Sequence, residues 1–132
     1  MKKVLILCTG NSCRSIIAEA LVNAKIDGIT ADSSGVKASG RVNPNAKKLL
    51  EEKGIWKDEY CSKTLETVIE NEYDLIVTVC DHANETCPMF PKPIAKMHVG
   101  FEDPDGKGFE AFEDTYKEIE EVLLPKVIEA LK

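Results

Sequence analysis

The clearest pattern along the chain is a pair of continuous apolar runs, at residues 4–7 and 75–77. Both runs contain β-branched residues and neither alternates with polar positions, which is typical of strands covered on both faces in a parallel sheet. The pattern predicts strands over residues 4–7 and 73–79. Weaker patterns favour two further strands, over residues 30–34 and 94–99, although the first of these is unusually polar.

Apolar residues at helical spacing predict helices between these strands. The first helix is expected to begin at Ser15 and to end before Gly28. Asn43 followed by Pro44 is typical of an N-cap and a first helical residue, and it predicts the start of a second helix. A short third helix is expected over residues 62–70.

A last helix is indicated near the C-terminal end of the sequence. Its apolar positions are Phe112, Tyr116, Ile119, Leu123 and Val127. Pro125 lies within this stripe and is expected to kink or interrupt the helix, because proline lacks an N–H and clashes with the preceding turn. Strands that alternate with helices predict a single α/β domain over residues 1–132.

The charge and the N-terminal segment narrow the possible functions. A net charge of -6 argues against nucleic acid as a partner. The short apolar run after the N-terminal lysines is too short for a secretory signal, and no segment approaches membrane-spanning length. We therefore expect a cytoplasmic protein without a membrane partner, and a monomer at this size.

Five cysteines require an explanation, at positions 8, 13, 61, 80 and 87. In a cytoplasmic protein they favour catalysis, redox exchange or metal binding over structural disulfides. No two of them form a CxxC pair, and His82 and His98 do not fall at zinc-finger spacing, so a structural zinc site is not expected. We expect His98 to be a hydrogen-bonding group at the end of a strand.

The segment between the first strand and the first helix has the pattern of an oxyanion site. It consists of Cys8, Thr9, Gly10, Asn11, Ser12, Cys13, Arg14 and Ser15. The N–H groups of such a turn can converge on one point, the helix adds its positive end, and Arg14 offers a bidentate fork. The same field is expected to lower the pKa of Cys8, which makes Cys8 a candidate nucleophile. The alternative is a buried strand-end cysteine and an unrelated surface arginine.

Other cysteines and acids either join this site or are structural. Cys80 ends the second buried strand, and ligands of open parallel sheets bind at the carboxyl ends of strands, so Cys8 and Cys80 are expected to face one crevice. Asp103, in a sequence typical of turns, is compatible with a general acid or with a simple turn. Cys13 and Cys61 are expected to be structural, because cysteine is commonly a small buried residue.

Several short motifs spread over nearly the whole chain combine into one pattern. Besides the loop, they are Ala18 with Glu19, residues 33–35, residues 42–44, residues 77–80 with Cys87 and Pro88, and residues 98–104. The combination resembles the thioredoxin-coupled arsenate reductases, which share the fold and anion loop of the low-molecular-weight protein tyrosine phosphatases. This resemblance implies a three-layer domain, with a four-stranded parallel sheet in the order 2-1-3-4 and helices on both faces.

The resemblance also implies a reaction, the reduction of arsenate to arsenite. Cys8 would attack arsenate in the loop while Arg14 and the loop amides hold its oxygens, and Asp103 would protonate the departing oxygen. Cys80 would then attack Cys8 and expel arsenite, and Cys87 would attack Cys80 to form the final disulfide. Thioredoxin would reduce that disulfide, and no bound cofactor is implied.

One departure from the family pattern concerns a cation. Some family members hold potassium near the loop through residues that match Asn11, Glu19 and Ser33, with an acid where this chain has Lys63. The Lys63 ammonium is expected to fill that site itself, so no bound metal is expected and activity should be indifferent to potassium.

Two other functions stay open at this point. A phosphomonoesterase, in particular a tyrosine phosphatase, would need only Cys8, Arg14 and Asp103, but in that branch a tyrosine usually follows the Asp-Pro pair, where this chain has Asp105. A non-catalytic redox sensor would form a disulfide without releasing arsenite.

Overall fold

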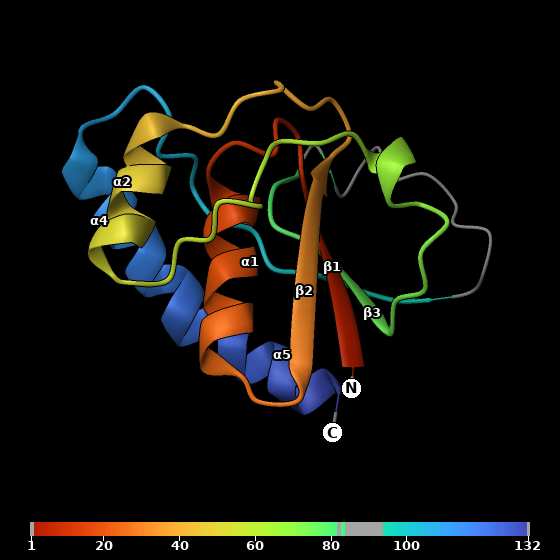
Figure 1. Ribbon diagram of the computed structural model, residues 1–132. Helices are drawn as coiled ribbons and strands as arrows, with labels where there is room; N and C mark the ends of the chain where they lie inside the picture. The colour runs from red at the N-terminus through yellow and green to blue at the C-terminus, as the bar shows by residue number, and fades with distance from the viewer. Residues whose placement is uncertain (1, 82, 84–93, 132) are drawn as a thin grey trace.

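The computed structural model describes residues 2–81, 83 and 94–131, and within them four strands form one parallel sheet (Figure 1). The strands are β1 (Lys2–Cys8), β2 (Ile29–Gly35), β3 (Leu75–Thr78) and β4 (Ala95–His98). Their order is β2-β1-β3-β4, and all neighbouring strands run parallel. The predicted α/β class with a parallel sheet in the order 2-1-3-4 is confirmed, as is each of the four expected strands.

The register brings the ends of the two central strands together. Leu7 of β1 lies opposite Thr78 of β3. The chain leaves β1 at Cys8, and directly after β3 the N–H of Val79 donates a hydrogen bond to the Leu7 carbonyl at 2.9 Å. Cys8 and Cys80 therefore lie at the same edge of the sheet, as expected for the carboxyl ends of parallel strands.

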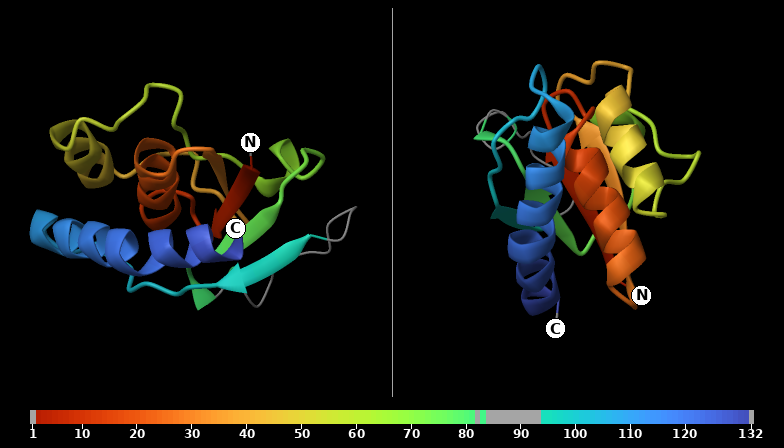
Figure 2. Two further views of the ribbon diagram at one scale, coloured as in Figure 1. Left: turned by 90° about the horizontal axis from the view of Figure 1, so that it is seen from below. Right: turned by 90° about the vertical axis from the view of Figure 1, so that its left-hand side faces the viewer.

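The long helices that the structure describes lie on one side of the sheet. They are α1 (Arg14–Lys25), α2 (Pro44–Glu52) and a C-terminal helix made of α4 (Phe109–Glu118), the π turn η2 (Ile119–Leu123) and α5 (Leu124–Ala130). Figure 2 shows these helices together on that side, while the single 3-10 turn η1 (Leu65–Thr67) lies on the other. Among the described helices, none has the length and apolar character needed to cross a membrane.

Helix α2 begins as the sequence predicts. Asn43 is its N-cap, and Asn43 Oδ1 accepts a hydrogen bond from the Asn45 N–H at 2.9 Å. Pro44 occupies the first turn, where its missing N–H costs nothing because that position has no partner within the helix.

The prediction of a helix over residues 62–70 is wrong, because only the single turn η1 forms there. The residues before η1 are hydrogen-bonded to the neighbouring chain instead. The Lys63 carbonyl accepts the Gly35 N–H at 2.9 Å, and the Lys63 N–H donates to Asn11 Oδ1 at 2.9 Å. These contacts keep the backbone extended as far as Thr64, whose ψ is 153°. Tertiary hydrogen bonds thus outweigh a local helical pattern.

The predicted interruption at Pro125 takes the form of a π turn rather than a break. The C-terminal helix widens over Ile119–Leu123, and Pro125 falls in the first turn of α5. Because proline has no N–H and its ring would meet the carbonyl four residues earlier, a widened turn lets the helix continue past it.

Gly35, the last residue of β2, is required by close packing against the loop that follows β1. A Cβ atom at this position would lie 2.5 Å from the Thr9 carbonyl oxygen and 3.1 Å from the Asn11 Cβ. Both atoms belong to the loop, so a side chain at residue 35 would displace the loop itself.

We expect Gly35→Ala to lower the free energy of unfolding by about 1–3 kcal/mol, the range for overpacked sites. It should also weaken the binding of inorganic phosphate, because the Thr9 carbonyl must move. Urea unfolding and calorimetric titration with phosphate measure the two effects. Gly108→Ala is the control, since an added Cβ there meets no atom within 4 Å and its φ is not positive. Wild-type stability in Gly35→Ala would contradict this packing role.

Candidate active site

The loop between β1 and α1 turns its carbonyl groups outward. Each carbonyl accepts a hydrogen bond from a backbone N–H of the segment after β2: Cys8 from Val36 at 3.1 Å, Thr9 from Lys37 at 3.0 Å, Gly10 from Ser39 at 2.9 Å and Ser12 from Asn43 at 2.9 Å. Within the described part of the chain, no backbone N–H of residues 10–13 donates to another protein atom. Because the N–H of a peptide points away from its C=O, these amides face the inside of the loop and form an anion-binding nest.

Asn11 supports this loop from inside the protein. The residue is fully buried and its backbone is left-handed, with φ 51°. Its Nδ2 donates to Ser15 Oγ at 2.7 Å and to Ser33 Oγ at 2.9 Å, and its Oδ1 accepts the Lys63 N–H at 2.9 Å. A left-handed asparagine persists where its surroundings fix it. The side chains of Asn11 and Ser15 are thus committed to the loop, and their predicted part in oxyanion binding rests on their backbone amides.

Arg14 and Asp103 lie beside each other at the end of the loop. Arg14 is the first residue of α1, which has no side-chain cap, so the first N–H groups of the helix add to the nest. Arg14 Nη1 donates to the Phe101 carbonyl at 3.0 Å, and Nη2 lies 3.5 Å from Asp103 Oδ2. The Arg14 side chain is 13% exposed and that of Asp103 52%. The structure therefore pairs a partly buried guanidinium with a carboxyl that is open to solvent.

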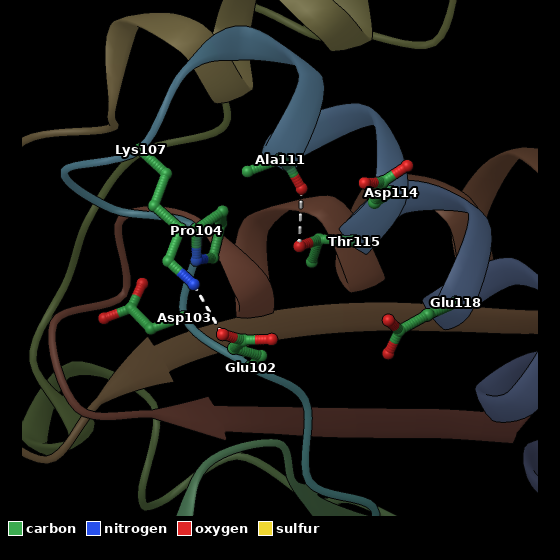
Figure 3. A pocket seen from close by; sticks show the side chains of 8 residues that line it. All are labelled: Glu102, Asp103, Pro104, Lys107, Ala111, Asp114, Thr115 and Glu118. Atoms are coloured by element: carbon green, nitrogen blue, oxygen red, sulfur yellow. Dashed lines mark hydrogen bonds and ion pairs between the residues drawn. The ribbon is translucent and has the colours of Figure 1, made fainter.

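An open hollow of about 180 Å³ lies beside Asp103 (Figure 3). Its lining residues are Glu102, Asp103, Pro104, Lys107, Ala111, Asp114, Thr115 and Glu118. Half of them are acids, and Lys107 is paired with Glu102. None of them belongs to the loop. Because clustered carboxylates repel anions, the loop rather than this hollow is the candidate oxyanion site.

Cys8 and Cys80 are both buried, and each thiol shifts the pKa of the other. The Cys80 sulfur also lies 3.2 Å from Thr9 Oγ1 and accepts the Ala83 N–H at 3.4 Å. The hydrogen bond with Cys8, followed by those from Thr9 and Ala83, lowers the pKa of Cys80 to about 5, and the charge of Arg14 acts in the same direction. The pKa of Cys8 is raised, first by the hydrogen bond with Cys80 and then by burial.

The sequence predicts a lowered pKa for Cys8, whereas in the structure the two thiols titrate together, with the pKa of Cys80 lowered and that of Cys8 raised. Two thiols in contact share one proton, so ionisation of one sulfur raises the pKa of the other. The Cys80 sulfur is hydrogen-bonded to Thr9 and Ala83, which favours its thiolate over that of Cys8.

A buried carboxyl, Glu19, supports the loop from α1. Its Oε1 accepts a hydrogen bond from Ser33 Oγ at 2.6 Å, and Ser33 in turn accepts the Asn11 amide. Burial raises the pKa of Glu19 to about 7, although the Ser33 hydrogen bond and the charge of Lys63 act in the opposite direction. Glu19 is therefore poised to gain or lose a proton near neutral pH.

The oxygen atoms of the predicted cation site are hydrogen-bonded to one another and to Lys63. Asn11 Oδ1 accepts the Lys63 N–H, and the Ser33 hydroxyl donates to Glu19. The Lys63 ammonium makes no ion pair with Glu19, so its predicted place in the cation site stays a prediction. In the residues that the structure describes, no three His, Cys, Asp or Glu side chains gather as a metal site.

The remaining predicted cysteines have different outcomes. Cys13 is buried as expected, whereas Cys61 is exposed, so its predicted burial is wrong. Residue type alone suggested that burial, and no apolar pattern surrounds Cys61 in the extended segment that precedes η1. Cys87 and His82 lie outside the described residues, and the predictions for them stay predictions.

His98, the last residue of β4, is a hydrogen-bonding group as predicted. Its Nδ1 lies 2.8 Å from Thr78 Oγ1 and its Nε2 lies 3.0 Å from Asp81 Oδ1. Sequence reasoning missed Asp81 as a partner, because no motif links a residue after β3 to the end of β4.

The fold and the site together define a class, an α/β protein with a cysteine-to-arginine oxyanion loop between a strand and a helix. The family model for low molecular weight phosphotyrosine protein phosphatases matches residues 3–132, and the chain belongs to this family. The resemblance inferred from the motifs is therefore confirmed.

Particular relatives include both reductases and a phosphatase. An arsenate reductase of Brevibacillus brevis is 41% identical over 119 residues, which cover 89% of this chain and 88% of that protein. The crystal structure of an arsenate reductase from Archaeoglobus fulgidus is 35% identical, with a TM-score of 0.81 over 94% of this chain and 98% of that one. A low molecular weight protein tyrosine phosphatase from T. tengcongensis is 28% identical, with a TM-score of 0.82 over 98% and 99% of the two chains.

The raised pKa of Glu19 predicts a pH dependence of stability. Its value of about 7 in the folded protein exceeds the reference value of 4.5, so between these pH values the folded state binds more protons than the unfolded state. The stabilisation from Glu19 is present below pH 4.5 and is lost as the pH rises through 7. The slope from this group is at most about 1.4 kcal/mol per pH unit.

Glu19→Gln should remove that slope, because glutamine does not titrate. Urea unfolding at several pH values within this window measures the effect, and Glu51→Gln, at an exposed position of α2, is the control that should retain the wild-type slope. Equal slopes for Glu19→Gln and wild type would show that Glu19 is not the titrating group.

Proposed function

We propose that the protein is an arsenate reductase in which two cysteines supply the electrons that reduce arsenic. The observation that carries this proposal is the position of Cys8 and Cys80 at the ends of neighbouring strands beside the oxyanion loop, where each thiol shifts the pKa of the other. A hydrolase needs only the first of these cysteines, whereas a second thiol in contact with it offers a route to a disulfide. The similarity to arsenate reductases at 41% and 35% identity supports the same choice.

The first step forms a bond between sulfur and arsenic. The inward N–H groups of the loop, the N-terminus of α1 and Arg14 hold the oxygens of the tetrahedral anion. Cys8 attacks arsenic as its proton passes to the Cys80 thiolate. An arsenic–oxygen bond breaks, and Asp103 protonates the hydroxyl oxygen, which leaves as water.

The second step transfers the electrons. Cys80 releases its proton to solvent and attacks the Cys8 sulfur, and a disulfide forms as the sulfur–arsenic bond breaks. Both electrons of that bond stay on arsenic, which leaves as arsenite, so the two electrons gained by arsenic are those lost by the two thiolates. The charge of Arg14 and the hydroxyl of Thr9 favour the Cys80 thiolate in this step.

Regeneration needs a third cysteine and an external dithiol. By resemblance to the family, Cys87 attacks Cys80, which frees the Cys8 thiolate and leaves a disulfide between Cys80 and Cys87. A dithiol protein such as thioredoxin then reduces this disulfide and is itself oxidised to a disulfide.

A tyrosine phosphatase is the second candidate. It is favoured by the assembly of Cys8, Arg14 and Asp103, which suffices for phosphate transfer without Cys80, and by the 28% identity to a phosphatase of known structure. Against it stands Asp105, which follows the Asp-Pro pair and accepts a hydrogen bond from Asn43 Nδ2 at 2.9 Å. An aspartate in this position offers no aromatic ring to stack on an aryl phosphate.

Arsenite production with thioredoxin, thioredoxin reductase and NADPH distinguishes the two functions. Wild type should turn over repeatedly. Cys80→Ser should already fail to release arsenite, and Cys87→Ser should release about one equivalent and then stop, because each lacks one thiol of the relay. Cys61→Ser is the matched control, since Cys61 is exposed and should be dispensable.

Other results would support the alternatives. If wild type produces no arsenite and Cys80→Ser still hydrolyses an aryl phosphate at the wild-type rate, the protein is a phosphatase. A disulfide that forms between Cys8 and Cys80 under oxidants without arsenite release would indicate a redox sensor.

Potassium should not change the rate of arsenate reduction, because the oxygens around Glu19 are engaged and the charge of Lys63 acts on the same carboxyl. Initial rates in potassium chloride and sodium chloride at equal ionic strength test this. A several-fold stimulation by potassium over sodium would refute it.

A further inference from the structure

His98 connects the residues on either side of Cys80. Its Nδ1 lies 2.8 Å from Thr78 Oγ1 and its Nε2 lies 3.0 Å from Asp81 Oδ1. Since a carboxylate only accepts hydrogen bonds, Nε2 donates to Asp81. Thr78 is the last residue of β3, and Asp81 directly follows Cys80. The imidazole therefore fixes the chain just before and just after the residue that carries the second sulfur.

We propose that His98 is a positioning residue for Cys80: it ties Asp81 to Thr78 and so holds the Cys80 sulfur against Cys8. The role of this arrangement in the reaction rests on the proposed reductase function, whereas the hydrogen bonds of His98 are independent of it. Within the described structure His98 makes no hydrogen bond to the loop or to either thiol, so it acts through Asp81 and not on the reacting atoms.

The contacts of the Cys80 sulfur depend on a fixed turn. The sulfur lies 3.2 Å from Thr9 Oγ1 and accepts the Ala83 N–H at 3.4 Å. The second contact exists only if the chain folds back directly after Cys80, and Asp81 is the first residue of that turn. A released Asp81 would also leave an unpaired carboxylate beside a thiolate, which disfavours the charged sulfur. Both effects would leave Cys80 less ionised and less well aimed at Cys8.

Gly100 gives independent support, because it leaves room for the pair. A Cβ at this position would lie 3.2 Å from His98 Nε2 and 3.5 Å from Asp81 Oδ1. The φ of Gly100 is not positive, so the backbone itself does not require glycine. A larger residue at position 100 would occupy the space beside the hydrogen-bonded side chains of His98 and Asp81.

The test compares His98→Ala with Met97→Ala, which truncates the neighbouring side chain of β4. Both are placed in a Cys87→Ser background, which stops the relay at the disulfide between Cys8 and Cys80. Three quantities are measured: the pH profile of Cys80 alkylation by iodoacetamide, the rate of disulfide formation after one addition of arsenate, and the affinity for inorganic phosphate.

We expect His98→Ala to slow disulfide formation about tenfold and to move the Cys80 alkylation profile upward by about one pH unit. Phosphate affinity should stay within about twofold, because the loop is untouched. Met97→Ala should match the parent in all three quantities. An unchanged alkylation profile in His98→Ala, or an equally large loss of phosphate binding, would overturn the positioning role.

Variants of the partners of His98 make the test specific. Asp81→Asn should retain the parental rate, because its amide oxygen still accepts from Nε2, whereas Gly100→Ala should change both Cys80 readouts in the same direction as His98→Ala. If His98→Ala does not fold, Asp81→Ala is the deciding variant, because the Asp81 side chain is 88% exposed. Disulfide formation in Asp81→Ala should be slower than in the parent. A rate equal to that of Asp81→Asn would refute the proposal.

Failure of the proposed function can be told apart from failure of this inference. If wild type produces no arsenite, the reductase function is wrong. The alkylation profile of Cys80 needs no arsenate and still decides whether His98 positions the sulfur.

Discussion

The site depends on a set of hydrogen bonds that hold the carbonyls of one short loop away from its centre. The segment after β2 binds these carbonyls from outside, and Asn11 fixes the loop from inside in a left-handed conformation. A neutral hydrogen bond contributes about 1 kcal/mol to stability, so several of them outweigh the similar cost of one strained residue. The amides are therefore aimed at the anion before it arrives, and no reorganisation is needed on binding.

The electrostatics of the two buried thiols follow from the way the parallel sheet places them. Parallel strands end side by side, which places Cys8 and Cys80 in contact, and burial opposes two charges in one place. One proton shared between two sulfurs is the result. The hydrogen bonds of the Cys80 sulfur with Thr9 and Ala83 favour its thiolate, and in the proposed reaction the transfer of one proton from Cys8 to Cys80 makes Cys8 the nucleophile.

The sequence predicts those parts of the molecule that depend on local pattern. The buried strands follow from continuous apolar runs, the start of α2 from Asn43, and the loop from the spacing of Cys8 and Arg14. What it misses depends on contacts between distant segments. Residues 62–64 stay extended because the loop and β2 bind them, and the Cys80 thiolate is favoured by hydrogen bonds with Thr9 and Ala83 that no spacing reveals.

The outward hydrogen bonds of the loop have a consequence for folding and for selectivity alike. The N–H groups that donate to the loop carbonyls come from segments that reach the loop only after β1 and β2 have paired. The anion-binding nest therefore exists only in the native state. Any tetrahedral oxyanion that binds it then stabilises the fold by mass action, in proportion to the logarithm of its concentration. Phosphate has the same shape and charge as arsenate. Phosphate that binds the loop and stabilises the folded protein therefore also competes with arsenate for the same site.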